Sequence, residues 1–144
     1  MNASVPRAAT FLEASRVLTG HPTPLIAVLD ERSGVAGLFG GEQMLRGLFP
    51  KYLEDLHHTA FATEDIALLL ERADPVLDDP VERHMEKAIM VVEAESSAMH
   101  VAERFLHSDL PALPVVARGE FRGMLVRSDF CRAMLERSEA LRSG

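Results

Sequence analysis

VAERFLHSDLPALPVVARGEFRGMLVRSDFCRAM, residues 101–134, is the stretch that decides the fold, because a similar pattern occurs at residues 13–45, EASRVLTGHPTPLIAVLDERSGVAGLFGGEQML. Each copy has a helical pattern, a proline-bearing turn, an apolar run, a second turn, an apolar run that begins at glycine (Gly37, Gly123) and a further helix. The offset between the copies is about 87 residues and drifts only at turns, where insertions are tolerated. A unit this short cannot bury its own apolar face, so we expect the two copies to pack together.

The composition is typical of a compact soluble protein. The 144 residues, of which 47% are hydrophobic, suit one domain or two small ones that share a core. No apolar run approaches the ~20 residues of a membrane-spanning helix, and the N-terminus lacks the features of a secretory signal. Cys131 is the only cysteine, so no internal disulfide is possible, and a reducing cytoplasm is the simplest location. We expect Cys131 to be a small core residue of the last helix.

The charge is unevenly distributed. The net charge is −7, and acidic residues dominate between Lys51 and Glu95. Nucleic-acid binding requires a basic face, so this acidic middle section argues against it. From Ser96 onward the chain is rich in arginine, which either holds a small anion or lies on solvated helix and strand edges.

Hydrophobic periodicity and turn residues predict alternating helices and strands. In chain order we expect a weak strand at 3–7, a helix over 8–18, strands over 25–29 and 35–39, a helix over 41–50, a helix from Thr63 through IALLLERA, a proline-punctuated loop at 73–80, a strand over 89–92, a helix from Ser97 to 106, strands over 113–116 and 121–126, and a helix over 128–141. The predicted division is a first repeat at 1–50, a helical linker at 51–80 and a second repeat at 81–144.

Three short motifs of the second copy identify a family. VERHM (81–85) is similar to an opening V-x-x-x-M, LPALPVV (110–116) to an l-P-V-V strand, and GMLVRSD (123–129) to a G-h-h-T-x-x-D segment. In this order and spacing, and with the duplication, the whole chain resembles a pair of cystathionine-beta-synthase-type (CBS) domains. The resemblance implies an α/β (α+β) fold of two strand-helix-strand-strand-helix repeats related by pseudo-twofold symmetry, with an inserted helical linker.

The resemblance also implies a ligand site. CBS pairs have clefts between the repeats, and many of these bind adenine nucleotides or related adenosyl compounds. The acidic residue of the family segment accepts hydrogen bonds from ribose hydroxyls, and its threonine contacts phosphate beside a helix N-terminus, which offers free N–H groups. Here Asp129 occupies the acidic position and Val126 the threonine position, while Ser128 is a substitute hydroxyl and Arg127 is placed to reach an anion.

The remaining second-copy residues implied at this site form the surroundings of the base. An apolar bed is expected from Ile89, Met90 and Val91, with backbone groups near Ala112 and Leu113 reading the base edge and Gly123 nearby. The site of the first copy is weaker. There Gly37 begins the segment, Gly40 stands at the hydroxyl position, and Gln43 stands at the acidic position without a charge.

Each of these residues also has a purely structural interpretation. Asp129 in the first turn of a helix stabilises that helix through its dipole, and Ser128 is an ordinary N-cap. Two functions therefore remain open. The first is a non-catalytic, homodimeric, cytoplasmic regulator that binds AMP, ADP, ATP or S-adenosylmethionine beside Asp129 and acts on an unknown protein partner, with no role for nucleic acid or membranes. The second is a ligand-free dimerisation scaffold, which Val126, Gly40 and Gln43 favour.

Other chemistry has no support in the sequence. His57 and His58 are adjacent and point apart, and His100 and His107 lack a third ligand at metal-binding spacing. The glycines form neither a Walker nor a dinucleotide motif, and no nucleophile elbow surrounds Ser128. We therefore expect no metal site and no enzyme activity.

Overall fold

The computed structural model describes residues 3–49, 66–87 and 89–143. Its strands form two three-stranded sheets in the orders β1-β2-β3 and β4-β5-β6, each with a parallel first pair and an antiparallel second pair. The elements are, in chain order, β1 (Ser4–Pro6), α1 (Phe11–Thr19), β2 (Leu25–Leu29), β3 (Val35–Gly40), α2 (Gly41–Leu48), α3 (Ile66–Ala73), the 3-10 helices η3 (Asp74–Asp78) and η4 (Val81–Arg83), β4 (Val92–Glu93), α4 (Ala98–Leu106), β5 (Ala112–Ala117), β6 (Glu120–Val126) and α5 (Arg127–Ser143). We call β1 to α2 repeat 1 and β4 to α5 repeat 2. Both repeats have the predicted element order, so the predicted fold class is confirmed.

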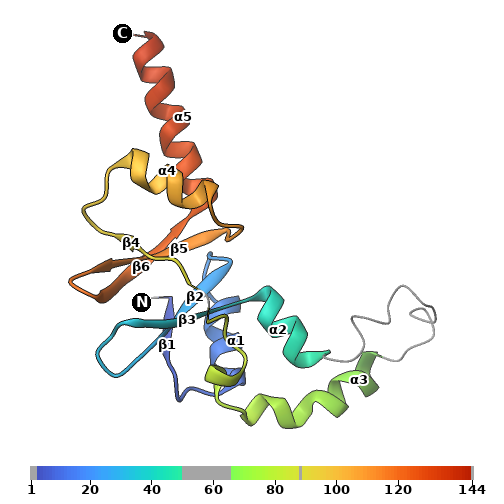
Figure 1. Ribbon diagram of the computed structural model, residues 1–144. Coiled ribbons are helices and arrows are strands. Elements are labelled where there is room, and N and C mark those ends of the chain that lie inside the picture. Colours follow the sequence, from blue (N-terminus) through green and yellow to red (C-terminus); the bar gives the residue numbers. More distant parts are fainter. Residues whose placement is uncertain (1–2, 50–65, 88, 144) are drawn as a thin grey trace.

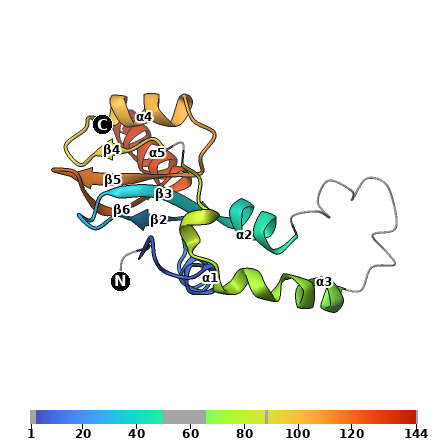
Figure 2. The same cartoon turned by 60° about the horizontal axis from the view of Figure 1, so that its bottom comes forward.

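The two sheets lie in the middle of the molecule, with α4 and α5 on one side and α1 and α2 on the other (Figure 2). A buried cluster of Leu25, Leu38 and Ala112 joins them, and Met124 packs against it. The hairpin turns of the two repeats also meet, since the Phe121 N–H donates to the carbonyl oxygen of Ser33 at 2.8 Å. The far end of α5 projects away from this body (Figure 1). The repeats therefore share one interface, as their sizes require.

Strand β2 is buried at four of its five positions because helices cover one face of its sheet and the second sheet covers the other. This confirms the prediction drawn from its unbroken apolar run. The weak opening strand of the first copy also exists, as β1, and pairs in parallel with β2 from Ser4↔Ala27 to Pro6↔Leu29. Proline is tolerated there because β1 is an edge strand.

The first helix of each repeat begins at a hydroxyl N-cap. The Thr10 hydroxyl accepts from the Glu13 N–H at 3.1 Å, and the Glu13 carboxylate accepts from the Thr10 N–H at 3.0 Å, which completes a capping box. In repeat 2 the Ser97 hydroxyl accepts from the His100 N–H at 3.1 Å. Gly20 ends α1, as predicted.

The strand predicted at 89–92 is shorter than expected. Only Val92 and Glu93 pair with β5, opposite Val115 and Val116. The next position of β5 is Pro114, which has no N–H to donate to a neighbouring strand, so pairing ends there.

Three further predictions on local structure were wrong. The expected loop at 73–80 contains η3, because Pro75 suits the first turn of a helix. Ser128 is not an N-cap, since β6 runs directly into α5 at Arg127. Cys131 is exposed because none of the described residues of α5 is buried.

Residues 79–86, which we call the strap, lie against repeat 1. Val81 is fully buried in the same core as Phe11, although the predicted second repeat begins at Val81. The predicted division at 50 and 80 stays a prediction. The residues 51–65 of the predicted linker, with His57, His58 and Thr63, lie outside the described part of the chain.

Candidate functional site

The N-terminus of α5 carries the predicted polar residues of repeat 2. The Arg127 N–H donates to the carbonyl oxygen of Pro111 at 2.8 Å, which holds the start of α5 beside the start of β5. The side chains of Arg127, Ser128 and Asp129 are exposed. The Asp129 carboxylate accepts from Arg132 at 3.0 Å, and both side chains are more than half exposed (59% and 64%). An exposed pair of this kind contributes about 0–1 kcal/mol, so it does not hold Asp129 away from a ligand.

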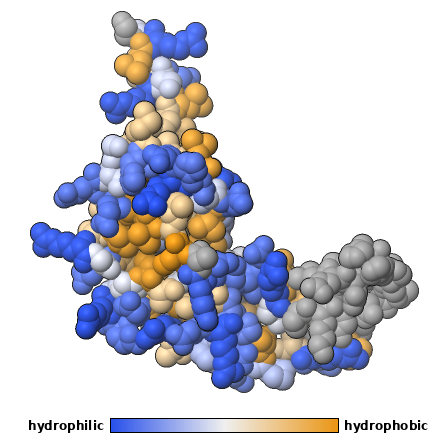
Figure 3. Space-filling view, in the orientation of Figure 1, coloured by the Kyte–Doolittle hydropathy of each residue, from blue (hydrophilic) through white to orange (hydrophobic). Residues whose placement is uncertain are grey.

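The predicted apolar bed is divided between two clusters. Ile89 packs against the inter-sheet cluster, whereas Met90 packs beneath α4 with Phe105 and Phe130. Ile89, Met90 and Val91 remain only half-buried. Apolar surface is visible in Figure 3 in the region where the chain runs into β4 and β6. The structure thus leaves partly open apolar surface ahead of β4.

The other predicted residues of repeat 2 differ in accessibility. Ala112 and Leu113 are fully buried, and Val126 is half-buried opposite Ala112 in the β5–β6 pair. Gly123 is open, since no atom lies within 4 Å of the position a Cβ would take. The structure therefore gathers Ala112, Val126 and the start of α5 at one end of β5 and β6, while Gly123 lies further along β6. Their role in binding stays a prediction.

The chain packs closely around the predicted site residues of repeat 1. A Cβ at Gly37 would lie 2.5 Å from Sδ of Met85 and 2.9 Å from the carbonyl oxygen of Glu86. Gly40 is as tight, with the carbonyl oxygen of Pro24 at 2.8 Å from its Cβ position. The side-chain oxygen of Gln43 accepts from the Gly40 N–H at 2.9 Å, so it caps α2. Repeat 1 thus uses its predicted ligand-binding residues for its own folding.

Sequence reasoning missed a concave region at the end of β1. It has a volume of about 540 Å³ and is lined by Pro6, Arg7, Ala8, Leu29, Asp30, Glu31, Pro80 and Glu82. Arg7 forms ion pairs with Glu31 and, at 3.4 Å, with Glu82. The hydrogen bond from Arg7 lowers the pKa of the Glu31 carboxyl, and the same bond raises the pKa of the Arg7 guanidinium. No motif marks this region, because its charges come from three separate segments.

The acidic residue beside it, Asp30, shapes a turn. Its carboxylate accepts from the N–H groups of Arg32 and Gly34 at 2.8 and 2.9 Å, and these bonds lower its pKa. Asp30 therefore closes the hairpin between β2 and β3. Within residues 3–49, 66–87 and 89–143, no group of three or more histidine, cysteine or acidic side chains is arranged to hold a metal ion. In the same part of the chain, no helix combines the length and the apolar character needed to span a membrane.

Comparisons with known proteins agree with this architecture. The family model of the CBS domain matches residues 81–136. A CBS domain-containing protein of unknown function from Kribbella flavida is 20% identical, with a TM-score of 0.76 over 94% of this chain and 93% of that one. The CBS-pair protein CBSX2 from Arabidopsis thaliana is 18% identical, with a TM-score of 0.70 over 96% of this chain and 89% of that one.

A second structure of CBSX2, in complex with AMP, is 19% identical, with a TM-score of 0.66 over 94% of this chain and 88% of that one. Among curated proteins, none matches this sequence. Residues 81–136 therefore match the CBS domain, and both repeats together have the fold of CBS-pair proteins.

Proposed function

We propose that this chain is a non-catalytic regulatory module that binds one adenosine-type nucleotide beside Asp129 and passes the bound state to a partner protein. The observation that carries the proposal is the contrast between the two repeats. Gln43 of repeat 1 is engaged in capping α2, whereas the Asp129 carboxylate is exposed at the start of α5. A ribose diol needs such an acceptor, and a carboxylate accepts more strongly than a neutral amide.

Three other features support a nucleotide at this position. Arg127 is the exposed first residue of α5, so its guanidinium can reach a phosphate held at this helix N-terminus. Ile89, Met90 and Val91 offer half-buried apolar surface for the base. CBSX2, which has the same fold, forms a complex with AMP. The absence of a hydroxyl at Val126 removes one phosphate contact, so we expect modest affinity.

The test is to titrate the full chain with AMP, ADP, ATP, S-adenosylmethionine and adenosine, and to measure each affinity by isothermal titration calorimetry. Hydrogen bonds to a charged group contribute about 1.5–3 kcal/mol, so Asp129→Ala should weaken binding of the best ligand by about 10- to 150-fold. Arg127→Ala should weaken AMP more than adenosine. Gln43→Ala in repeat 1 is the matched control and should leave the affinity unchanged. Equal affinity in the wild type and Asp129→Ala would disprove the proposed site.

A ligand-free dimerisation scaffold is the second candidate, and a separate observation favours it. Large apolar side chains on α4 and α5 are exposed: Met99 by 80%, Leu106 by 83%, Leu135 by 61% and Leu141 by 77%. Exposed apolar residues that gather on one side of a protein often mark an interface. A second copy of the chain would cover both helices at once.

The scaffold function predicts a dimer that needs these side chains. In light scattering coupled to gel filtration, the double variant Leu106→Glu with Leu135→Glu should be monomeric at concentrations where the wild type is dimeric. Leu45→Glu on α2, where Leu45 is 50% exposed, is the control and should leave the dimer intact. A dimer that binds no nucleotide would favour the scaffold over the regulator.

A further inference from the structure

The strap (residues 79–86) completes repeat 1 with two sets of backbone hydrogen bonds. At the start of α1, the Phe11 N–H donates to the carbonyl oxygen of Asp79 at 2.7 Å, and the Val81 N–H donates to the carbonyl oxygen of Ala9 at 2.8 Å. At the edge of β3, Leu38 and Glu86 exchange two hydrogen bonds, at 3.0 and 2.7 Å. The strap therefore extends repeat 1 at two separate points.

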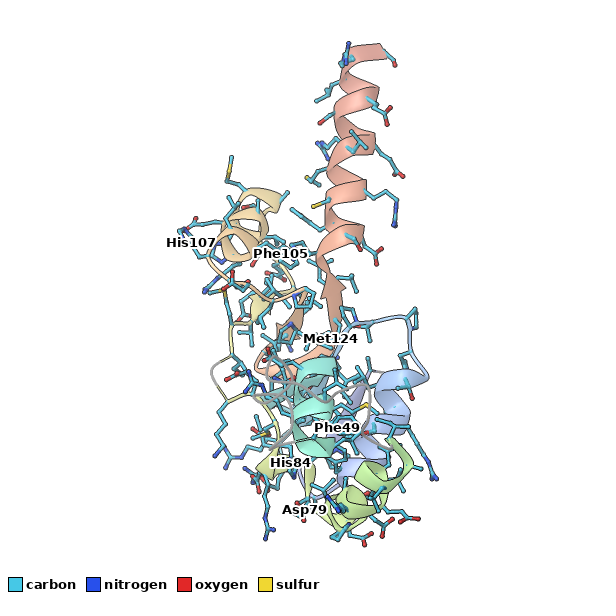
Figure 4. The ribbon with its side chains drawn as sticks, turned by 90° about the vertical axis from the view of Figure 1, so that its right-hand side faces the viewer. Phe49, Asp79, His84, Phe105, His107 and Met124 are labelled. Atoms are coloured by element: carbon cyan, nitrogen blue, oxygen red, sulfur yellow. The ribbon has the colours of Figure 1, made fainter. Side chains whose placement is uncertain are left out.

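Two side chains of the strap fill spaces in repeat 1. Val81 is fully buried beside Phe11, and Met85 lies over Gly37, where a Cβ would meet its sulfur at 2.5 Å. His84 holds the strap in shape, because its ring packs against Phe11 with centroids 5.0 Å apart and bonds Asp79 at 2.9 Å. Figure 4 shows His84 and Asp79 together at the repeat 1 end of the molecule.

Repeat 2 presents the same backbone at the start of its first helix. The turn before α1 is closed by a bond from the Ala9 N–H to the carbonyl oxygen of Pro6 at 3.0 Å. The equivalent bond before α4, from the Ser96 N–H to the carbonyl oxygen of Glu93, is also 3.0 Å. The N–H of Ala98 thus corresponds to the N–H of Phe11, and the carbonyl oxygen of Ser96 corresponds to that of Ala9. The Phe11 and Ala9 groups are the two of repeat 1 that bond the strap at this point. No described residue bonds to the corresponding groups of Ala98 and Ser96.

The outer edge of β6 presents the same backbone groups as the edge of β3 that bonds the strap. Met124 stands opposite Pro114 as Leu38 stands opposite Ala27, so by this shared register the N–H and carbonyl of Met124 point away from β5. They correspond to the Leu38 groups that hold Glu86, and none of the described segments pairs with them. Beside them Gly123 has nothing within 4 Å of its Cβ position, whereas its counterpart Gly37 is covered by Met85. Repeat 2 thus has both attachment points of a strap and no described strap.

We propose that repeat 2 binds an extended segment of a partner protein in the way that repeat 1 binds its own strap. The segment would pair with Ser96 to Ala98 and with Met124, and would place an unbranched apolar side chain over Gly123. The segment would have a second apolar side chain four residues before the first, as Val81 precedes Met85 in the strap. This second side chain would be larger than valine. The reason is that Phe11 of repeat 1 is replaced in repeat 2 by the exposed Ala98, which leaves room for a larger side chain.

Main-chain groups and side-chain size, rather than charge, define the segment, because repeat 2 carries seven arginines and eight acidic residues between Val92 and Ser143. Main-chain pairing supplies affinity in such complexes and the side-chain spaces supply specificity. This inference does not rest on the nucleotide proposal: the two share Gly123, but the segment does not use Asp129.

The test uses the intact chain and a synthetic peptide of residues 76–87. In NMR titrations of the isotopically labelled protein, the peptide should shift the amide signals of Ser96 to Ala98 and of Gly123 to Leu125 in a saturable way. A peptide with Val81→Phe should bind several-fold more tightly, because its ring fills the space beside Ala98. A peptide with Met85→Asp should bind at least tenfold more weakly.

A protein variant provides the decisive control. Gly123→Val has open space for its side chain and suits a strand, so it should fold normally, yet it fills the space that the methionine needs. It should weaken peptide binding at least tenfold, while Gly41→Ala, whose Cβ also meets nothing within 4 Å, should not. Three results would overturn the proposal: no saturable shifts, equal binding by Gly123→Val, or shifts confined to Phe11 and Leu38, which would mean exchange of the resident strap. A Gly123-dependent dimer formed without peptide would assign the surface to the strap of a second copy instead.

Discussion

Repeat 1 and repeat 2 have the same order of elements but differ in how they are closed. In repeat 1, Phe11 is fully buried and lies against Phe39 and the strap residue His84. Its ring also needs Gly47, since a Cβ there would lie 2.4 Å from Cε2 of Phe11. In repeat 2 the same position is taken by Ala98, which is exposed.

This difference shows that the fold and the binding surfaces of a duplicated protein depend on different residues. The shared apolar runs and caps decide the strands and helices of both copies. A few changes of side-chain size then decide which copy is filled by its own chain and which one keeps open surface. Gly37 and Gly123 make the point most simply, because the same residue type is covered in one repeat and open in the other.

The largest effect is expected at Phe11. Phe11→Ala removes a fully buried ring from the core of repeat 1 and should lower the free energy of unfolding by about 3–5 kcal/mol. It also removes the surface that holds Val81 and His84 of the strap. Chemical denaturation followed by circular dichroism measures this loss. Glu103→Ala, at an exposed position of α4 in repeat 2, is the control and should change stability by less than about 0.5 kcal/mol. Equal effects of the two variants would contradict the described core.

The two glycines allow a matched comparison of smaller effects. Gly37→Ala places a methyl group 2.9 Å from the backbone oxygen of Glu86, which has little freedom to shift, so we expect a loss of about 1–3 kcal/mol. Gly123→Ala meets open space and removes the entropic cost of a glycine in a strand, so we expect a gain of up to about 1 kcal/mol.

Thermal and chemical unfolding of both glycine variants in parallel would test this. A destabilised Gly123→Ala would mean that the edge of β6 is covered in the folded protein, and would count against the strap-binding surface of repeat 2. If Gly37→Ala left the free energy of unfolding unchanged, Met85 and Glu86 would not hold the close contact with β3.

Local patterns predicted most of the elements correctly, because each depends on residues near in sequence. The unbroken run of β2, the Ser97 cap and the turn at Gly20 are examples. The strap was not predicted, because it depends on the fit between Met85 and Gly37, which are far apart in the chain. The predicted strand at 89–92 exists but was predicted too long for a similar reason, since its length is limited by Pro114 on another strand.

The candidate site likewise could be predicted only where it depends on residues near in sequence. The motif located the start of α5, where Arg127 and Asp129 are exposed, and their role in binding stays a prediction. It did not show that Gln43 of repeat 1 is used to cap α2, because that bond depends on the conformation at Gly40. The concave region at Arg7 left no signal in the sequence, since ion pairs between distant segments have no local pattern.

The smallest expected effect is a difference in how the stability contributed by the N-caps of α1 and α4 depends on pH. Glu13 closes the capping box of α1. The hydrogen bond that its carboxylate accepts from the Thr10 N–H lowers the pKa of that carboxyl. A carboxyl whose pKa is lower in the folded state stabilises that state above its unfolded pKa, near 4.3, and loses this contribution as the pH falls through the folded value. The equivalent position of α4 is His100, which supplies no carboxylate.

We therefore expect Glu13→Gln to be less stable than the wild type at pH 7 and to approach it as the pH falls below about 4. Ser97→Ala removes a cap without a carboxylate, so its loss of about 0.5–2 kcal/mol should be the same at both pH values. Urea unfolding of the three proteins at pH 7 and pH 3.5 makes the comparison. If the gap between Glu13→Gln and the wild type did not narrow in acid, the Glu13 carboxylate would not contribute to the cap of α1, and the two repeats would begin their first helices in the same way.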